Sequence, residues 1–237
     1  MKKNGLFRRA FRLKESNCTI ITDREDTIEK AKSSIELHRR QLERYVQENP
    51  EFLYSLQPVP ADRGPRVTRL MTEASLKADV GPMAAVAGVL ADLAVEEMIR
   101  AGSKVAVVEN GGEISAMSNQ PIDIALAAGD APLSREIGFR LKEFPVGVAT
   151  SSGLYSHALS FGGAEAVTIF AEDAGVADAA ATSVANLIRG DDVRAIIREG
   201  LDRALGIEGV KGVFILYRGE VGKAGKVPEI IKINSQR

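Results

Sequence analysis

Apolar and polar residues alternate near the start of the chain and then recur with a helical period. The alternation covers residues 6–13 and 19–22, which predicts two short strands joined as a hairpin. From residue 27 to about residue 48, apolar side chains return at helical spacing, which predicts a long helix that Pro50 ends. Its buried stripe is expected to consist of Ile28, Ala31, Ile35, Leu42 and Val46.

The next segment predicts two more helices with breaks between them. Residues 55–65 contain three prolines and are expected to form a loop. One helix is predicted over residues 66–77, and another begins at Pro82 and runs to about residue 100. Gly102 follows that helix where a left-handed C-terminal cap is expected.

The second half of the chain predicts mostly strands. Helices are expected only over residues 174–188, with Asp173 as the N-terminal cap, and over residues 192–205. Residues 212–218 and 228–233 are expected to pair as a terminal hairpin. The remaining short apolar runs predict strands at residues 104–109, 114–117, 122–128, 137–141, 147–150 and 166–170.

The order of these elements predicts the fold class. Helices come in blocks between runs of neighbouring strands, and strict alternation of strand and helix is absent. This order favours an α+β layered fold with a mainly antiparallel sheet over a doubly wound parallel sheet. We expect a single domain over residues 1–237, in which residues 1–50 form an N-terminal extension.

Composition and charge exclude several classes of function. The chain has 237 residues, of which 45% are apolar, so it is long enough to bury a sizeable core. Its 31 basic and 32 acidic residues almost cancel, and aromatic residues make up only 5%. We therefore expect no nucleic-acid partner and no anionic membrane partner, since neither a basic surface nor a stacking platform is indicated.

The chain contains one cysteine, Cys18, which excludes an internal disulfide framework and a cysteine-rich zinc site. This cysteine usage favours a cytoplasmic location. The first residues are basic but lack the apolar core of a secretory signal, and no apolar run is long enough to span a membrane. In a strand, Cys18 is expected to be buried and unreactive rather than nucleophilic.

Asp178 and Thr182 are the strongest candidates for a metal site. They are four residues apart on a predicted helix, so their side chains share one face among Ala, Gly and Val. A hard cation such as Mg²⁺ prefers oxygen ligands of this kind. The alternative is a solvent-facing Asp178, with the Thr182 hydroxyl bonded to the carbonyl four residues earlier.

A loop rich in hydroxyl groups follows a predicted strand. Thr150, Ser151, Ser152 and Gly153 offer hydroxyls and backbone amides that would hold an anion, and His157 would donate to a phosphate or relay a proton. The alternatives are an ordinary turn at the end of a strand and a structural histidine.

Glycines mark two further places where a ligand would approach the backbone. Gly111 and Gly112, followed by Glu113, come directly after an apolar strand, although a hairpin turn uses the same residues. Gly81 precedes the helix that starts at Pro82, and the free N–H groups of a helix start attract anions. These residues are the remaining candidates for cofactor binding.

Three segments together resemble the ApbE superfamily, whose founding members are Mg²⁺-dependent FAD:protein FMN transferases. The segments are VVENGGEISA, VATSSGLYSHALS and VTIFAEDAGVADAAAT, in the family's order. The resemblance places Glu113 where the family has an aspartate and His157 on the family's histidine. It also places Asp178 and Thr182 on the positions that bind magnesium in the transferases.

Most of residues 35–187 is also similar to an uncharacterised prokaryotic branch of that superfamily. The segments that carry this likeness are HRRQLERYVQENPEFLYSLQPV and VGPMAAVAGVLADLAVE. The resemblance implies the T-fold-like α+β architecture of the superfamily. It further implies a small-molecule ligand, FAD or FMN, bound in a cleft together with Mg²⁺.

Two departures from the transferase pattern leave the function open. The transferases have a Lys-Gly-Tyr element where this chain reads MAAVAGV, and Asp-Pro-Arg-Thr-Gly where residues 160–163 read SFGG. One interpretation is a divergent FMN or nucleotidyl transferase or a hydrolase. The alternative is a non-catalytic carrier or assembly factor in sulfur or cofactor metabolism. A third interpretation is a homo-oligomer docked through the long arginine-rich helix.

Overall fold

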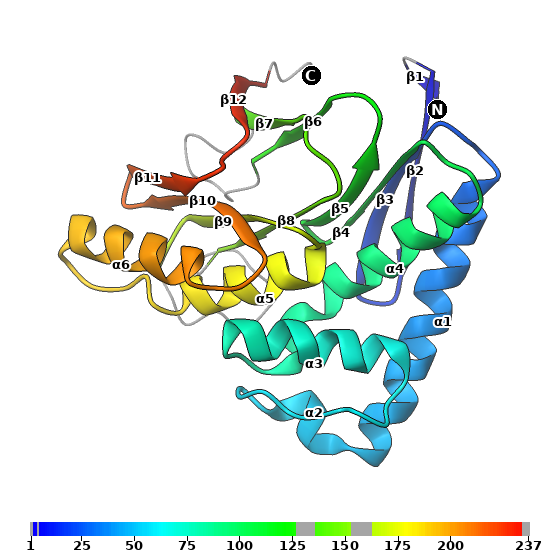
Figure 1. Cartoon of the computed structure of the whole chain (residues 1–237), viewed down its shortest axis with the longest axis horizontal. Helices are drawn as coiled ribbons and strands as arrows, with labels where there is room; N and C mark the ends of the chain where they lie inside the picture. Colours follow the sequence, from blue (N-terminus) through cyan, green and yellow to red (C-terminus); the bar gives the residue numbers. More distant parts are fainter. Residues whose placement is uncertain (1, 4, 127–135, 153–162, 234–237) are drawn as a thin grey trace.

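The computed structural model describes residues 2–3, 5–126, 136–152 and 163–233 and forms three layers. A block of helices covers one face of a large sheet, and a small sheet lies on the opposite face (Figure 1). Mixed helices and antiparallel strands confirm the α+β class predicted from the order of elements.

The large sheet is antiparallel throughout and has nine strands. The predicted N-terminal hairpin is part of it, because the second strand of that hairpin pairs with the strand that begins at Val105. In spatial order the strands are β1 (Lys2–Lys3), β2 (Leu6–Leu13), β3 (Ser16–Thr22), β4 (Val105–Asn110), β5 (Glu113–Ser118), β8 (Val146–Ser151), β9 (Ala166–Ala171), β10 (Val210–Tyr217) and β11 (Glu220–Gly225).

The small sheet corrects the predicted terminal hairpin. It consists of β12 (Glu229–Lys232), β7 (Ile137–Leu141) and β6 (Ile122–Ala125), in that order. The prediction that residues 212–218 pair with residues 228–233 is wrong, because β10 pairs with β11 and β12 pairs with β7. Arg218 and Gly219 both have positive φ and form the tight turn that brings β11 back along β10.

The predicted helices are confirmed, with small changes at their ends. Gly102 has φ of 95° and follows its helix as the expected left-handed cap. The Asp173 side chain caps its helix by accepting a hydrogen bond from the N–H of Val176. The helices are α1 (Thr27–Glu48), α2 (Pro50–Tyr54), α3 (Arg66–Ala78), the 3₁₀ helix η1 (Pro82–Ala85), α4 (Val86–Arg100), α5 (Ala174–Ala185) and α6 (Val193–Leu205), of which α2 was not predicted.

The apolar core fills both spaces between the layers. On the helical side, α4 and α5 lie at the centre, and α1 and α3 pack around them (Figure 1). Between the two sheets, Phe139 packs edge-to-face against Phe170 and Phe214. Among the described residues no single helix is long and apolar enough to cross a membrane, although α3 and η1–α4 pass that test as a pair bent by 102°.

Candidate functional site

Asp178 lies near the start of α5 and faces the beginning of α4. Its Oδ2 accepts a hydrogen bond of 3.0 Å from the backbone N–H of Gly88, in the first turn of α4. The first N–H groups of a helix have no partner within the helix and carry a partial positive charge, so a carboxylate is stabilised there. Asp178 is therefore not the solvent-facing residue of the alternative interpretation.

Asp92 on α4 makes the reciprocal contact with the start of α5. Its two carboxylate oxygens accept hydrogen bonds of 3.0 Å and 2.9 Å from the N–H groups of Ala174 and Gly175. Each helix thus caps the other. The helices approach closely because Gly88 has no side chain: a Cβ there would lie 2.1 Å from the carbonyl oxygen of Ala174.

Glu113 starts β5 directly after the turn at Gly111 and Gly112. Both glycines have positive φ, and Asn110 pairs with Glu113 across the turn, so the hairpin-turn interpretation is confirmed. Burial, helped by the charge of Glu109 and opposed by a backbone hydrogen bond, raises the pKa of Glu113 to about 7. The carboxylate is half-buried at the end of the strand pair.

Glu113 and Asp178 interact electrostatically. Burial raises the pKa of Asp178 well above its usual value, and the negative charge of Glu113 raises it further, whereas the N–H groups of Gly88 and Ala87 lower it. No lysine or arginine of the described part of the chain forms an ion pair with either carboxylate. Because two unpaired carboxylates are costly to keep charged in a half-buried site, the pair favours a shared proton or a bound cation.

Asp92 is a third carboxylate whose pKa is raised. Burial and the charge of Asp173 raise the pKa of Asp92, the Ser115 hydroxyl and the α5 N–H groups lower it, and the net result is a pKa of about 7. The charge of Asp92 in turn raises the pKa of Asp178. Negative charge therefore accumulates where α4 and α5 meet.

Asn110 connects the end of β4 to the same part of α4. Its Nδ2 donates to the carbonyl oxygen of Ala87 over 3.1 Å, and its Oδ1 accepts from the Cys18 Sγ over 3.3 Å. Cys18 is buried, as predicted, and burial raises the pKa of its thiol to about 12. The thiol therefore stays protonated and serves as a hydrogen-bond donor in this network.

The predicted hydroxyl loop is described only in part. Thr150 hydrogen-bonds to Thr168 through the two hydroxyl groups, over 2.9 Å, and Ser151 and Ser152 are buried at the end of β8. Gly153 and His157 lie outside the described residues. Strand β8 pairs with β5 and packs under α5, so it is a neighbour of both elements that carry the carboxylate pair.

Thr182 and Gly81 are the remaining predicted site residues that the structure describes. Thr182 is half-buried one turn after Asp178, and its hydroxyl makes no hydrogen bond to any other described residue, so the bond to the carbonyl of residue 178 that the alternative interpretation requires is absent. Gly81 caps η1, and a Cβ there would lie 1.9 Å from the carbonyl oxygen of Ser55. Its described contacts are with the loop after α2 rather than with the carboxylates.

The donor set fits a small hard cation only in part. Within the described ranges, no group of three or more His, Cys, Asp or Glu residues is arranged to hold a metal ion. Two carboxylates and one hydroxyl are present, all of them oxygen donors. Mg²⁺ is commonly held by one or two carboxylates, with water and phosphate oxygens as its other ligands, so this set is compatible with it.

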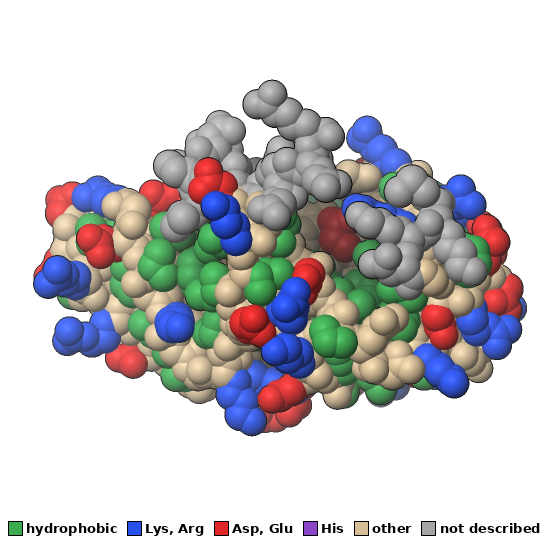
Figure 2. Space-filling view, turned by 90° about the horizontal axis from the view of Figure 1, so that it is seen from above, with side chains coloured by type: hydrophobic (Ala, Val, Ile, Leu, Met, Phe, Trp, Pro, Cys, Tyr) green, Lys and Arg blue, Asp and Glu red, His purple; other side chains and the backbone are tan. Residues whose placement is uncertain are grey.

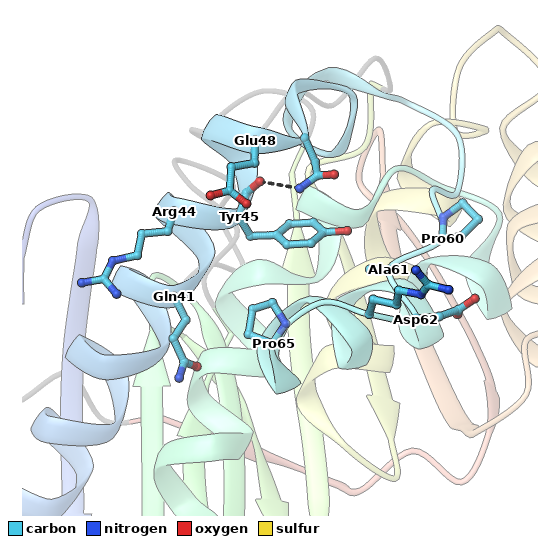
Figure 3. Close-up of a pocket in the computed structure, with 10 residues that line it drawn as sticks. Gln41, Arg44, Tyr45, Glu48, Pro60, Ala61, Asp62 and Pro65 are labelled. Carbon is cyan, nitrogen blue, oxygen red and sulfur yellow. Dashed lines mark hydrogen bonds between the residues drawn. The ribbon is translucent and has the colours of Figure 1, made fainter.

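A separate cavity of about 680 Å³ lies at the C-terminal end of α1. The Tyr45 ring projects from α1 toward the loop of residues 60–65 (Figure 3). The Asn49 side chain donates a hydrogen bond to the Tyr45 carbonyl. Basic and acidic side chains balance around the cavity, and none of the predicted site residues lines it. The cavity therefore does not belong to the carboxylate site.

The fold is similar to that of solved flavin transferases. The apo structure of the flavinyl transferase ApbE from Pseudomonas stutzeri matches with a TM-score of 0.59 and 15% identity, covering 95% of this chain and 96% of that chain. The flavin transferase ApbE from Vibrio cholerae matches with a TM-score of 0.56 and 11% identity, covering 93% and 97%. At these identities the likeness shows the fold alone.

The family follows from the sequence comparisons. A family model described as AbpE bacteria matches residues 1–205, so the chain belongs to that family. The UPF0280 protein of Methanocaldococcus jannaschii is 38% identical over 235 residues, which is 97% of this chain and 95% of that protein. The UPF0280 protein of Methanothermobacter thermautotrophicus is 42% identical over 195 residues, 81% of this chain and 76% of that protein.

Proposed function

We propose that Asp178 and Glu113 form a divalent-cation site and that the chain uses it to bind the diphosphate of a flavin nucleotide. The observation that carries the proposal is the half-buried pair of carboxylates, which has raised pKa values and forms no ion pair with a cationic side chain of the described residues. Membership of a family whose structural neighbours are flavin transferases supports the choice of ligand.

Residues of two elements would form the cation site. Asp178 and Thr182 come from α5 and Glu113 from β5, and all three offer oxygen. Mg²⁺ suits such ligands and keeps several sites for water or phosphate. When bound, the cation would neutralise the pair and offset the charge of the diphosphate.

The end of β8 would hold the rest of the anion. Ser151 and Ser152 lie at the end of this strand, and we propose that their hydroxyl and amide groups, with Gly153 and His157, contact the ligand. The ligand would be FAD or FMN, of which only FAD contains a diphosphate. The reaction on FAD would be attack of a hydroxyl or of water on one phosphorus of the diphosphate, so that the FMN or nucleotidyl group is transferred and the other nucleotide leaves. His157 would accept the proton of the attacking hydroxyl.

Titration calorimetry tests the ligand and the cation together. FAD, FMN and ADP would each be titrated into the protein with MgCl₂ and with EDTA. We expect FAD to bind at least about tenfold more tightly with Mg²⁺, and we expect Asp178→Asn to abolish that difference. The control variant is Glu172→Gln, which removes an exposed carboxylate just before α5. Absence of binding by all three ligands would rule out this function.

A second function is favoured by the start of α4. The segment MAAVAGV contains only small or apolar residues and no lysine or aromatic residue to hold a nucleotide. This composition suits a non-catalytic carrier or assembly factor in sulfur or cofactor metabolism. Incubation of labelled FAD with candidate acceptor proteins separates the two functions: FMN transfer supports the enzyme, whereas Mg²⁺-dependent binding without turnover supports the carrier.

A further inference from the structure

A second cavity, of about 440 Å³, lies between the two sheets. It is lined by the end of β7, the start of β8, Phe170 of β9, the start of β10 and the segment from Lys226 to Glu229. This is the face of the large sheet opposite to α4 and α5, so the cavity is separate from the Asp178 site (Figure 1). Its volume falls within the range of sites for small molecules, about 300–1,000 Å³.

The floor of the cavity is apolar. Leu141, Val146 and Phe170 line it and belong to the buried cluster between the sheets, and the half-buried Val227 packs against the same cluster. Seen from the side of the small sheet, apolar surface is bordered by basic and acidic side chains (Figure 2). A ligand that enters would therefore contact hydrocarbon below and charged groups at the rim.

The rim carries more positive than negative charge. Of its four basic residues, two have carboxylate partners: Arg140 pairs with Asp123 at 2.8 Å, and Lys142 pairs with Glu229 at 2.6 Å. The other two, Lys211 and Lys226, form no ion pair with any residue in the described ranges. Glu143 also lines the rim and forms no ion pair in the described ranges, so one positive charge is in excess once Asp123, Glu229 and Glu143 are counted against the four basic residues.

Lys211 and Lys226 also occupy opposed positions at the open end of the β10–β11 hairpin. The N–H of Lys226 donates to the carbonyl oxygen of Lys211 over 2.7 Å, just beyond the paired residues Gly212 and Gly225 of the β10–β11 hairpin. Like charges at opposed positions destabilise a strand pair. An anion between the two ammonium groups would remove this repulsion, which points to a negatively charged ligand.

We propose that this cavity binds an organic anion with an apolar body, its acidic group between Lys211 and Lys226 and its apolar body over Phe170 and Val146. The inference does not depend on the function proposed for the Asp178 site. The shared chemistry is a carboxylate, sulfonate or phosphate monoester on an aromatic or aliphatic group. Inorganic phosphate alone would bind only weakly, because it lacks the part that covers the apolar floor.

Fluorescence titration with 1-anilinonaphthalene-8-sulfonate tests the proposal, with dodecanoate and inorganic phosphate as competitors. We expect one saturable site from which dodecanoate displaces the probe and phosphate does not. The double variant Lys211→Gln/Lys226→Gln should bind the probe about tenfold more weakly. Lys223→Gln, an exposed lysine of β11 that does not line the cavity, is the matched control and should bind as the wild type does.

Three results would overturn the proposal: no saturable binding, equal affinity in the double variant and the wild type, or displacement by phosphate as effective as by dodecanoate. Asp178→Asn should leave probe binding unchanged. That variant separates a failure of this proposal from a failure of the flavin site, because Asp178 on α5 and this cavity lie on opposite faces of the large sheet.

Discussion

The Oδ2 of Asp178 accepts a hydrogen bond of 3.0 Å from the backbone N–H of Gly88, which joins α5 to the first turn of α4. Asp92 returns the contact from α4 to the first N–H groups of α5. The two central helices therefore hold each other's N-termini with carboxylates. The same arrangement brings Asp178 close to Glu113 and creates the negative site on which the proposed function rests.

Gly88→Ala is expected to destabilise the protein by about 3 kcal/mol, because the added methyl group meets the backbone of Ala174, which cannot move without separating α4 from α5. The matched control is Gly206→Ala. A Cβ at Gly206 has no neighbour closer than 3.4 Å, and φ there is −77°, so its effect should stay within about 1 kcal/mol. Urea denaturation gives the free energy of unfolding of each variant. Equal losses in Gly88→Ala and Gly206→Ala would contradict the close approach of α4 and α5.

Asn110→Ala is expected to lower the free energy of unfolding by about 2 kcal/mol. The substitution leaves the carbonyl of Ala87 and the thiol of Cys18 without their shared partner in a buried site. Asn119→Ala, at an exposed position between β5 and β6, serves as control and should change stability by less than about 0.5 kcal/mol. If thermal denaturation shows no difference between the two variants, the amide does not hold the start of α4.

The carboxylate pair predicts how stability depends on pH without divalent cations. Because the folded-state pKa of Asp178 and of Glu113 is raised, the folded protein binds more protons than the unfolded chain between about pH 4.5 and pH 7. The contribution of the pair to stability is therefore complete below pH 4 and is lost as the pH rises through 7. For Glu113 the loss is on the order of 3 kcal/mol.

Asp178→Asn keeps an oxygen for the Gly88 N–H but removes the charge. Its free energy of unfolding should fall less between pH 5.5 and pH 8 than that of the wild type, so the variant gains relative stability as the pH rises. Glu172→Gln should follow the wild type. Chemical denaturation at each pH gives the comparison, and parallel curves for the Asp178 variant and the wild type would show that the two carboxylates do not interact.

Cys18 is expected to react slowly with thiol reagents in the folded protein. The side chain is buried and burial raises the pKa of the thiol to about 12, so thiolate is scarce at neutral pH. Reaction with 5,5′-dithiobis(2-nitrobenzoate) should be at least about 100-fold slower than in guanidinium chloride. A fast native reaction would instead assign Cys18 a role as an exposed nucleophile.

Local sequence patterns were sufficient to predict most elements and to select Asp178 and Glu113 as candidates. Asp178 and Glu113 follow from the spacing of polar residues in apolar segments, and the caps at Asp173 and Gly102 follow from the chemistry of helix ends. Strand β11 and the partner of β12 could not be predicted in this way. Glycines interrupt the alternation in β11, and β12 pairs with β7, which is remote in the sequence.

The contacts around the carboxylates depend on packing that no single segment encodes. Gly88 and Asp92 are four residues apart and share a face of α4, opposite the Ala- and Gly-rich α5, and this spacing is the feature that could have identified them. The local pattern places Asn110 only between the predicted strand of residues 104–109 and the turn at Gly111. Its bonds to Ala87 and Cys18 join three elements, so they become visible only in the folded chain.

If Asp178 and Glu113 share a divalent cation, anomalous scattering will locate it between them. A crystal grown with MnCl₂ as a substitute for Mg²⁺, together with FAD, would be measured near the manganese absorption edge. We expect one strong anomalous peak within about 2.5 Å of a carboxylate oxygen of both residues, and its loss in Asp178→Asn. A manganese peak that lies elsewhere, with both carboxylates free of metal, would contradict it.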